Sequence, residues 1–144
     1  MKKFLFILLL LSAWAYAETV YAEPVPTFEN PRKVLFSIIK GDDKSIHHVL
    51  NSANNVLKYY GPENIQMRII AYSDGIKAVL KKESAFAKRI DALMQYEVEF
   101  YTCGNTMRTK KIKKTQLIDD VEIVSAGIVE IIERVQEGWI YIKP

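Results

Sequence analysis

The segment VLFSIIKGDD, residues 34–43, is an apolar run that ends in a lysine, a glycine and two aspartates. A short apolar run bounded by a glycine loop is typical of a buried β-strand. A helical pattern follows, because apolar residues recur at spacings of three and four until Gly61 and Pro62 end it. These residues are Ile46, Val49, Leu50, Ala53, Val56 and Leu57. The segment therefore predicts a strand joined by a loop to an amphipathic helix.

The same alternation continues to the C-terminus. Further strands are predicted at residues 66–72, 98–102, 121–124 and 139–142. The helices predicted between them are a short one carrying Ile76, Val79 and Leu80, one capped by Ser84, one starting just beyond Asn105 and Thr106, and one at residues 128–136. Strands separated by helices are joined by right-handed crossovers, which make them parallel. The predicted fold class is α/β, a flavodoxin-like three-layer sandwich with a mostly parallel five-stranded sheet.

The 144 residues are 49% hydrophobic and 26% charged, a composition typical of one globular domain. The N-terminus is different, because Lys2 and Lys3 precede an apolar run that is followed by Ala15-Tyr16-Ala17. This is the plan of a secretory signal peptide at residues 1–17, with an alternative cut after residue 22. Residues 18–32 hold three of the five prolines and predict an extended arm. Residues 33–144 are then a single domain.

The predicted signal peptide determines the expected location and partners. Its apolar run is too short to cross a bilayer, so we expect a periplasmic protein whose mature form has no membrane attachment. Removing Lys2 and Lys3 from the 20 basic residues leaves 18 against 17 acidic ones, a net charge of +1. A near-neutral secreted chain is not expected to bind nucleic acid.

The loops after the predicted strands supply the candidate site residues. In open α/β sheets the crevice outside the carboxyl ends of the strands is the usual ligand site. Each of these loops contains a glycine, which lets the backbone approach a ligand closely. The candidates are Gly41, Asp42, Gly75, Gly104 and Gly127. Glycine is also ordinary in turns, so these loops do not identify a site by themselves.

Cys103 carries most of the chemical information. It is the only cysteine, which excludes an intrachain disulfide and any four-thiolate metal site. It ends a predicted strand just before a predicted helix, where backbone N–H groups stabilise an anion. Nearby cations also lower the pKa of a thiol; they are Arg108, Lys110, Lys111, Lys113 and Lys114. The alternative is a small buried hydrophobe beside a solvated basic face.

Other uses of the thiol are less well supported. A cysteine hydrolase needs a histidine nearby. The only histidines, His47 and His48, are adjacent on the first predicted helix and point to different faces. Two adjacent histidines and one thiol also lack the spacing of a tetrahedral metal site. We therefore expect neither a metal nor a cofactor.

Two segments carry a resemblance to a known family. VEFYTCGNTMR, residues 98–108, and VEIVSAGIVEIIERVQEGWIYIKP, residues 121–144, resemble the DsrE/DsrF-like family, particularly its secreted single-domain members, within a YchN-like superfamily of sulfur-relay proteins. The shared features are the cysteine followed closely by Asn-Thr-Met-Arg, the Ala-Gly helix start and the closing Gly-Trp motif. The similarity extends back through KVLFSIIKGDD and LNSANNVLKYYG, so it covers residues 33–144. The departure is at residues 71–75, where many relatives carry a histidine or a second small residue before the glycine.

The resemblance implies a flavodoxin-like domain that assembles into trimers or hexamers. It also implies a cysteine that carries sulfane sulfur as a persulfide between partner proteins, and Cys103 holds that position. A dithiol oxidoreductase would need a second cysteine, which this chain lacks. On this hypothesis the amides of Gly104, Asn105 and Thr106 hold the anion together with Arg108, and Asn105 orients the loop.

The sulfur hypothesis also names possible partners. The lysine cluster would attract thiosulfate, polysulfide or an acidic partner protein that donates or accepts sulfur. The alternative hypothesis is a noncatalytic oligomeric periplasmic module that binds a small anionic ligand or a protein. It is motivated by the missing histidine partner and by an apolar tail that suggests burial against another subunit; the tail is Trp139, Ile140, Tyr141 and Ile142.

Overall fold

The structure is a computed structural model that describes residues 17–82 and 84–144. The predicted signal peptide lies outside the described residues apart from Ala17. Residues 17–31 form neither helix nor strand. The ring of Tyr21 in this segment packs against Tyr59 and Tyr60, with centroids 5.5 Å apart in each pair. The segment therefore contacts the end of the first helix before the sheet begins.

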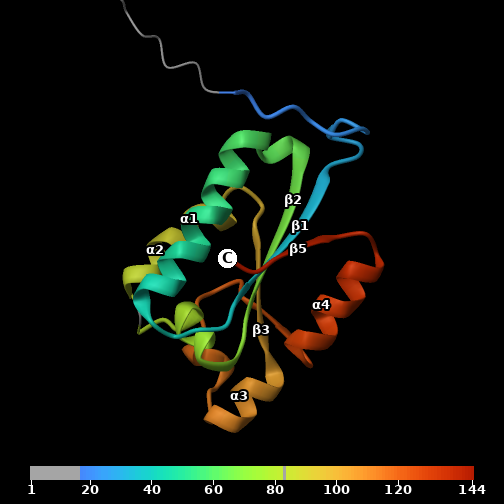
Figure 1. Cartoon of the computed structure of the whole chain (residues 1–144). Helices are drawn as coiled ribbons and strands as arrows, with labels where there is room; N and C mark the ends of the chain where they lie inside the picture. The colour runs from blue at the N-terminus through green and yellow to red at the C-terminus, as the bar shows by residue number, and fades with distance from the viewer. Residues whose placement is uncertain (1–16, 83) are drawn as a thin grey trace, which may run out of the picture.

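Five strands form one sheet in the order β4-β3-β2-β1-β5, and every pair is parallel. The strands are β1 (Arg32–Ile38), β2 (Ile65–Ala71), β3 (Glu99–Cys103), β4 (Glu122–Val124) and β5 (Ile140–Ile142). The first four strands are added in one direction across the sheet, and the chain then returns to place β5 beside β1 (Figure 1). The carboxyl ends of all five strands consequently lie at one edge.

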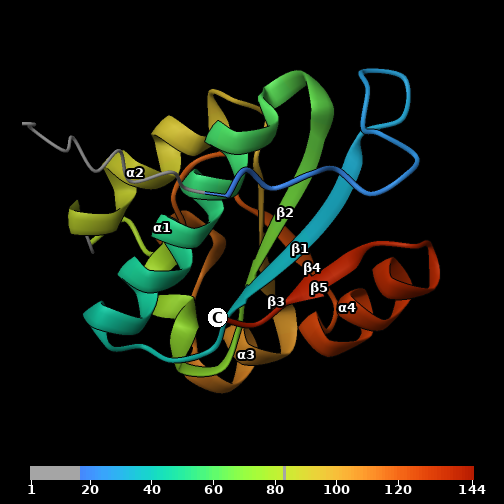
Figure 2. The ribbon, with the colours of Figure 1, turned by 45° about the horizontal axis from the view of Figure 1, so that its top comes forward.

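Helices cover both faces of the sheet. The α-helices are α1 (Asp43–Tyr60), α2 (Ser84–Met94), α3 (Gly104–Lys110) and α4 (Gly127–Gln136), and the 3₁₀ turns are η1 (Pro62–Asn64), η2 (Ser73–Val79) and η3 (Lys114–Gln116). In Figures 1 and 2, α1 and α2 lie on one side of the sheet and α4 lies on the other. The predicted three-layer α/β sandwich is confirmed, and its sheet is entirely parallel.

Two local predictions differ from the structure. The short helix expected around Ile76 and Val79 is a 3₁₀ helix, in which residues three apart lie on one side. Both side chains are buried, so this spacing places them together in the hydrophobic core. The helix expected to begin after Thr106 begins instead at Gly104, because Cys103 is still extended and is itself the residue preceding the first turn.

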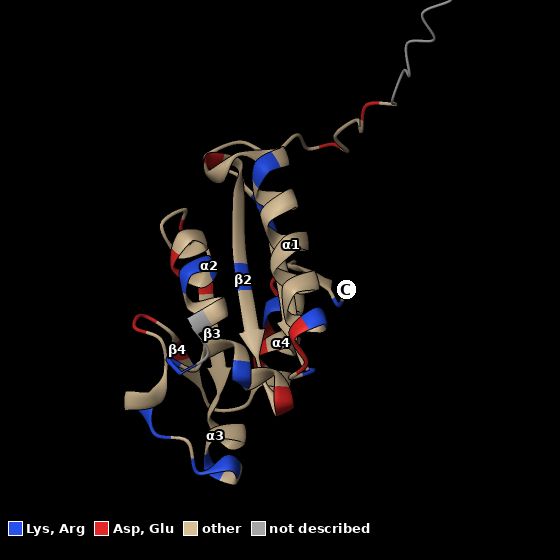
Figure 3. Ribbon diagram, turned by 90° about the vertical axis from the view of Figure 1, so that its left-hand side faces the viewer, with Lys and Arg blue, Asp and Glu red and all other residues tan. Residues whose placement is uncertain are grey.

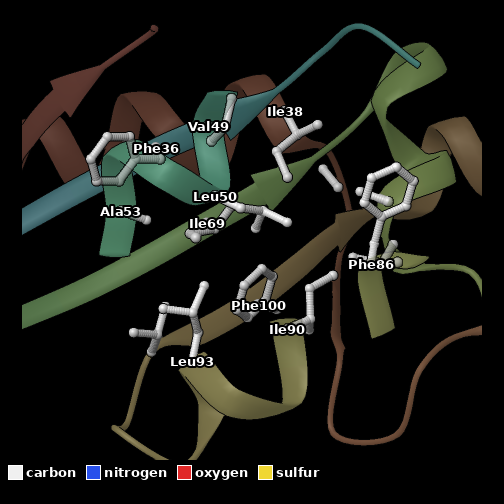
Figure 4. Close-up of a cluster of buried hydrophobic side chains, with 14 of the residues drawn as sticks. Phe36, Ile38, Val49, Leu50, Ala53, Ile69, Phe86, Ile90, Leu93 and Phe100 are labelled. Carbon is white, nitrogen blue, oxygen red and sulfur yellow. The ribbon is translucent and has the colours of Figure 1, made fainter. Parts of the chain in front are cut away.

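The main hydrophobic core lies between the sheet and the pair α1 and α2. Phe36 and Phe100 from the strands meet Leu50 of α1 and Phe86 of α2, and all four are 1% exposed or less (Figure 4). A second, smaller cluster lies under α4 and consists of Leu35, Ile70, Ile131 and Trp139. The two faces therefore differ greatly in how much apolar surface they bury.

A buried ion network completes the smaller cluster. Arg68 of β2 contacts Glu99 of β3 and Glu130 of α4, with nitrogen–oxygen distances of 2.6 Å in both pairs. Its guanidinium lies 4.2 Å from the ring centroid of Tyr101 and 5.2 Å from that of Trp139. Burial lowers the pKa of Arg68, but the hydrogen bond and charge of Glu99 outweigh it, so this pKa is raised. The network fastens α4 to the sheet.

We predict that Arg68→Met lowers the free energy of unfolding by about 1–3 kcal/mol, because the half-buried Glu130 loses its partner at 2.6 Å and keeps Arg134, whose Nε lies 3.3 Å away. Urea unfolding followed by circular dichroism measures this change. Lys81→Met is the matched control, since its ion pair with Asp119 is exposed and contributes about 0–1 kcal/mol. Equal losses in the two variants would show that the network does not stabilise the fold.

Candidate functional site

Cys103 is the last residue of β3, and α3 begins at the next residue. In the sheet it pairs with Val124 of β4. Alternate residues of a strand share a face, so Cys103 lies on the same face as Tyr101, which packs against the cluster under α4. The thiol is therefore on the α4 side of the sheet, at its carboxyl edge, and the residue is 6% exposed.

Backbone groups and one hydroxyl lower the pKa of this thiol, although the Asn105 N–H also donates to the Ser125 carbonyl at 3.3 Å. Burial raises the pKa of Cys103, but hydrogen bonds from the backbone of Gly127, from the backbone and hydroxyl of Thr106, and from the backbone of Asn105 outweigh it. The pKa of Cys103 consequently lies below its ordinary value. A lowered pKa favours the thiolate, which is the nucleophilic form of cysteine.

Thr106 connects the thiol to the loop after β2. Its Oγ1 accepts a hydrogen bond from the Ser73 N–H at 3.1 Å, which leaves the hydroxyl proton to be donated to Cys103. Ser73 has a left-handed backbone with φ 54°, a conformation uncommon for a residue other than glycine. The Thr106 side chain thus holds the β2 loop and the thiolate together.

Gly127 lets the start of α4 approach the thiol. A Cβ atom built on Gly127 would lie 3.4 Å from the Cβ of Cys103, 3.4 Å from the Cβ of Tyr72 and 3.3 Å from Ile70. The contact with Ile70 is tighter than side chains ordinarily make, and the other two are at the limit of ordinary contact. Glycine therefore suits this close approach of α4 to Cys103.

Gly104 and Asn105 also lie at the thiol, but Arg108 has a different partner. A Cβ on Gly104 would approach the Val124 carbonyl to 3.2 Å, so Gly104 allows β4 to pack close. The Arg108 guanidinium donates to the side-chain oxygen of Asn105. Contact between Arg108 and an anion on Cys103 stays a prediction.

Gly41, Asp42 and Gly75 lie in the loops after β1 and β2 and have packing roles there. The Asp42 carboxylate accepts from the Ser45 N–H at 2.9 Å and caps α1, which lowers the pKa of Asp42. A Cβ on Gly41 would meet the Asp74 carbonyl at 2.7 Å, and one on Gly75 would meet the Ile38 carbonyl at 2.1 Å. The nearest atoms to both glycines belong to neighbouring loops and not to Cys103.

The histidines do not serve the thiol. His47 contacts Arg89 of α2 at 2.7 Å and stacks on Phe86, on the α1 and α2 side of the sheet. His48 is exposed on α1. Within residues 17–82 and 84–144, no group of three or more His, Cys, Asp or Glu side chains is placed to hold a metal ion. None of the helices in the same described ranges is long and apolar enough to span a membrane.

Comparisons with known proteins identify the family of this chain. A sequence model of the DsrE/DsrF-like family matches residues 33–144, the whole of the sheet domain from the second residue of β1. The chain belongs to the DsrE/DsrF-like family. The family is generally associated with sulfur relay. No curated protein matches the chain in sequence.

Two solved structures are similar to this member of the DsrE/DsrF-like family. One is the protein of unknown function MTH1491 from Methanobacterium thermoautotrophicum, with 26% identity and a TM-score of 0.74. The other is the ychN protein from E. coli, with 18% identity and a TM-score of 0.69, which shows the fold alone. Each comparison covers 78% of this chain and 99% of the other.

A cluster of hydroxyl groups beside Cys103 was missed by the sequence analysis. Ser37 of β1 and Tyr141 of β5 are hydrogen-bonded at 2.8 Å, and Tyr141 is also a hydrogen-bond partner of Tyr72. Burial, with smaller contributions from Tyr141 and Cys103, raises the pKa of Tyr72 to about 12. Tyr72 therefore keeps its proton in the neighbourhood of Cys103. The sequence holds no signal for this cluster, because it depends on β5 pairing with β1.

We predict that Thr106→Val moves the pH midpoint of Cys103 alkylation to higher pH. The lost hydroxyl makes the reaction at neutral pH about fivefold slower, the effect of one hydrogen bond. Iodoacetamide labelling followed by mass spectrometry over a pH series measures the shift. Thr109→Val is the control, because that hydroxyl donates to the Asn105 carbonyl and not to the thiol. An unchanged midpoint in Thr106→Val would mean that the hydroxyl does not stabilise the thiolate.

Proposed function

We propose that this protein carries sulfane sulfur as a persulfide on Cys103 and passes it between partner proteins. The observation that carries the proposal is the convergence of the Gly127, Thr106 and Asn105 amides on a buried thiol whose pKa is lowered. Membership of the DsrE/DsrF-like family supports it. A thiol that served only as a small core residue would gain nothing from three donors aimed at its anion.

The proposed loading step needs one thiolate. The Cys103 thiolate attacks the sulfane sulfur of polysulfide or thiosulfate and forms a new S–S bond. The donor's own bond to that sulfur breaks, and its electron pair leaves on a shorter polysulfide or on sulfite. The donors around Cys103 favour the attacking thiolate because they outweigh the cost of its burial.

In the proposed unloading step, Cys103 is the leaving group and no longer the attacking thiolate. An acceptor thiolate attacks the outer sulfur of the persulfide, and the bond between that sulfur and Cys103 breaks. The electron pair returns to Cys103, where the same amides stabilise the leaving thiolate. Neither step needs a second cysteine in this chain, which has only one.

We also propose that the protein acts in the periplasm as a homo-oligomer, a trimer or a hexamer. The apolar surface of α4 and β5 supports the assembly: Ile128, Val129, Ile132, Val135, Ile140 and Tyr141 are each 36% to 55% exposed. A contiguous apolar surface of this kind commonly marks a protein–protein contact. Because α4 begins over Cys103, the assembly would place a second subunit near the thiol.

We predict that brief exposure to polysulfide or thiosulfate adds one or more sulfur atoms to the protein, and that reductant removes them. Intact mass spectrometry of protein recovered from the periplasm of an expression host measures the adduct and also shows whether the chain begins after residue 17 or 22. Cys103→Ser is the control and should fold normally without gaining sulfur. If wild type gains none and Cys103 resists alkylation until unfolding, the thiol is structural and a noncatalytic binding module is favoured.

We predict that Ile132→Lys converts the oligomer to a monomer, because it places a charge in the apolar contact. Light scattering coupled to size-exclusion chromatography measures the mass. The control is Tyr96→Lys, an equally exposed site in the turn after α2. A monomeric wild-type protein, or the same oligomer in both variants, would exclude assembly through α4.

A further inference from the structure

A groove of about 470 Å³ lies between α3 and the edge strand β4. Its floor is apolar, since it contains the buried Met107, the half-buried Ile112 and the 39% exposed Ile123. Exposed isoleucine on an edge strand is costly in water unless something covers it. Gly104 also lines the groove and directly follows Cys103 in the chain.

The rim of the groove is cationic. Arg108, Lys111 and Lys113 line it and are exposed. Among the described residues, no carboxylate lies within ion-pair distance of these three side chains. Two other lysines do form ion pairs, Lys110 with Asp74 and Lys81 with Asp119. In Figure 3, the blue Lys and Arg positions lie on α3 and on the segment that follows it. The positive charge of the rim is therefore not neutralised within the described chain.

The backbone around the groove is suited to an extended ligand. β4 is an outer strand of the sheet, so its free edge offers backbone donors and acceptors to another strand. Lys111 has a left-handed backbone with φ 54° at the end of α3, where glycine is the usual residue. A lysine at this position keeps its charge on the rim in a conformation that disfavours side chains.

We propose that this groove binds an extended acidic segment of a partner protein. One apolar side chain of the segment lies on the floor formed by Met107, Ile112 and Ile123, and flanking carboxylates lie against the cationic rim. A hollow receives the apolar side chains of a ligand, whereas a membrane-binding surface presents protruding apolar groups to the lipid. This interface goes beyond the proposed function, because it does not require sulfur on Cys103.

The probe is a synthetic peptide, Gly-Glu-Asp-Leu-Phe-Glu-Asp-Gly, titrated into ¹⁵N-labelled full-length protein. We expect saturable amide shift changes confined to residues 104–113 and 122–124, and weaker binding at high salt. Ile123→Thr should weaken binding through the floor. Lys111→Gly with Lys113→Gln should weaken it about threefold for each charge, and the glycine suits the left-handed backbone. Lys58→Gln, an exposed lysine at the last turn of α1, is the control and should bind as wild type.

Other outcomes would overturn the proposal. They are an absence of saturable shifts, equal weakening by the Lys58 variant, or equal binding of a peptide in which serine replaces leucine and phenylalanine. Sedimentation of the protein with vesicles containing phosphatidylserine, without peptide binding, would assign the surface to a membrane. Sulfur loading is measured separately, so a failure of peptide binding leaves the persulfide proposal intact.

Discussion

The right-handed crossover between parallel strands is the constraint on which the site depends. Four strands added in one direction place α1 and α2 on one face, and only the return from β4 to β5 places a helix on the other. Cys103 points to that second face, so the first residue of α4 is the one that can close over it. Gly127 favours this approach, because a Cβ there would lie 3.4 Å from Cys103 and 3.3 Å from Ile70. The topology and one glycine thus bring an α4 amide to a thiol at the end of β3.

The face of the sheet that carries the thiol buries few apolar side chains and includes a charged one. Its apolar cluster has four buried residues, and Arg68 lies among them with its charge matched by Glu99 and Glu130. A buried ion network of this kind adds little stability over apolar packing, but it is costly to break. The network therefore determines the position of α4 more than it adds to the stability of the fold. That fits a helix whose position sets the pKa of Cys103 and whose outer surface remains apolar and exposed.

Much of the fold was predictable because its signals are local. Apolar runs and helical spacing located all five strands and the main helices, and a lone cysteine at a strand end identified the candidate site. The donors from Asn105 and Thr106 follow in sequence, so their approach to Cys103 was also predictable. The Gly127 amide and the group of Ser37, Tyr72 and Tyr141 depend on strand order and register, which no local pattern specifies. Gly41 and Gly75 pack closely against Asp74 and Ile38, and their predicted role in binding an anion stays a prediction.

Cys103 is buried, yet the proposed function requires it to react with a partner molecule. Cys103 is 6% exposed, which protects it from random oxidants, and the hydrogen bonds that lower its pKa favour the nucleophilic thiolate. The selectivity of Cys103 must then depend on which molecules can reach it at the carboxyl edge of the sheet. With one cysteine, the proposed carrier could not release sulfur by forming an internal disulfide, so the proposed loading and unloading steps both require a second molecule to dock. The basic groove proposed as a partner surface begins at Gly104, the residue after the thiol, but it is lined by Met107 and Ile123 on the opposite face of the sheet from Cys103. The chemistry of the thiol and the recognition of its partner are therefore best tested as separate properties of two surfaces.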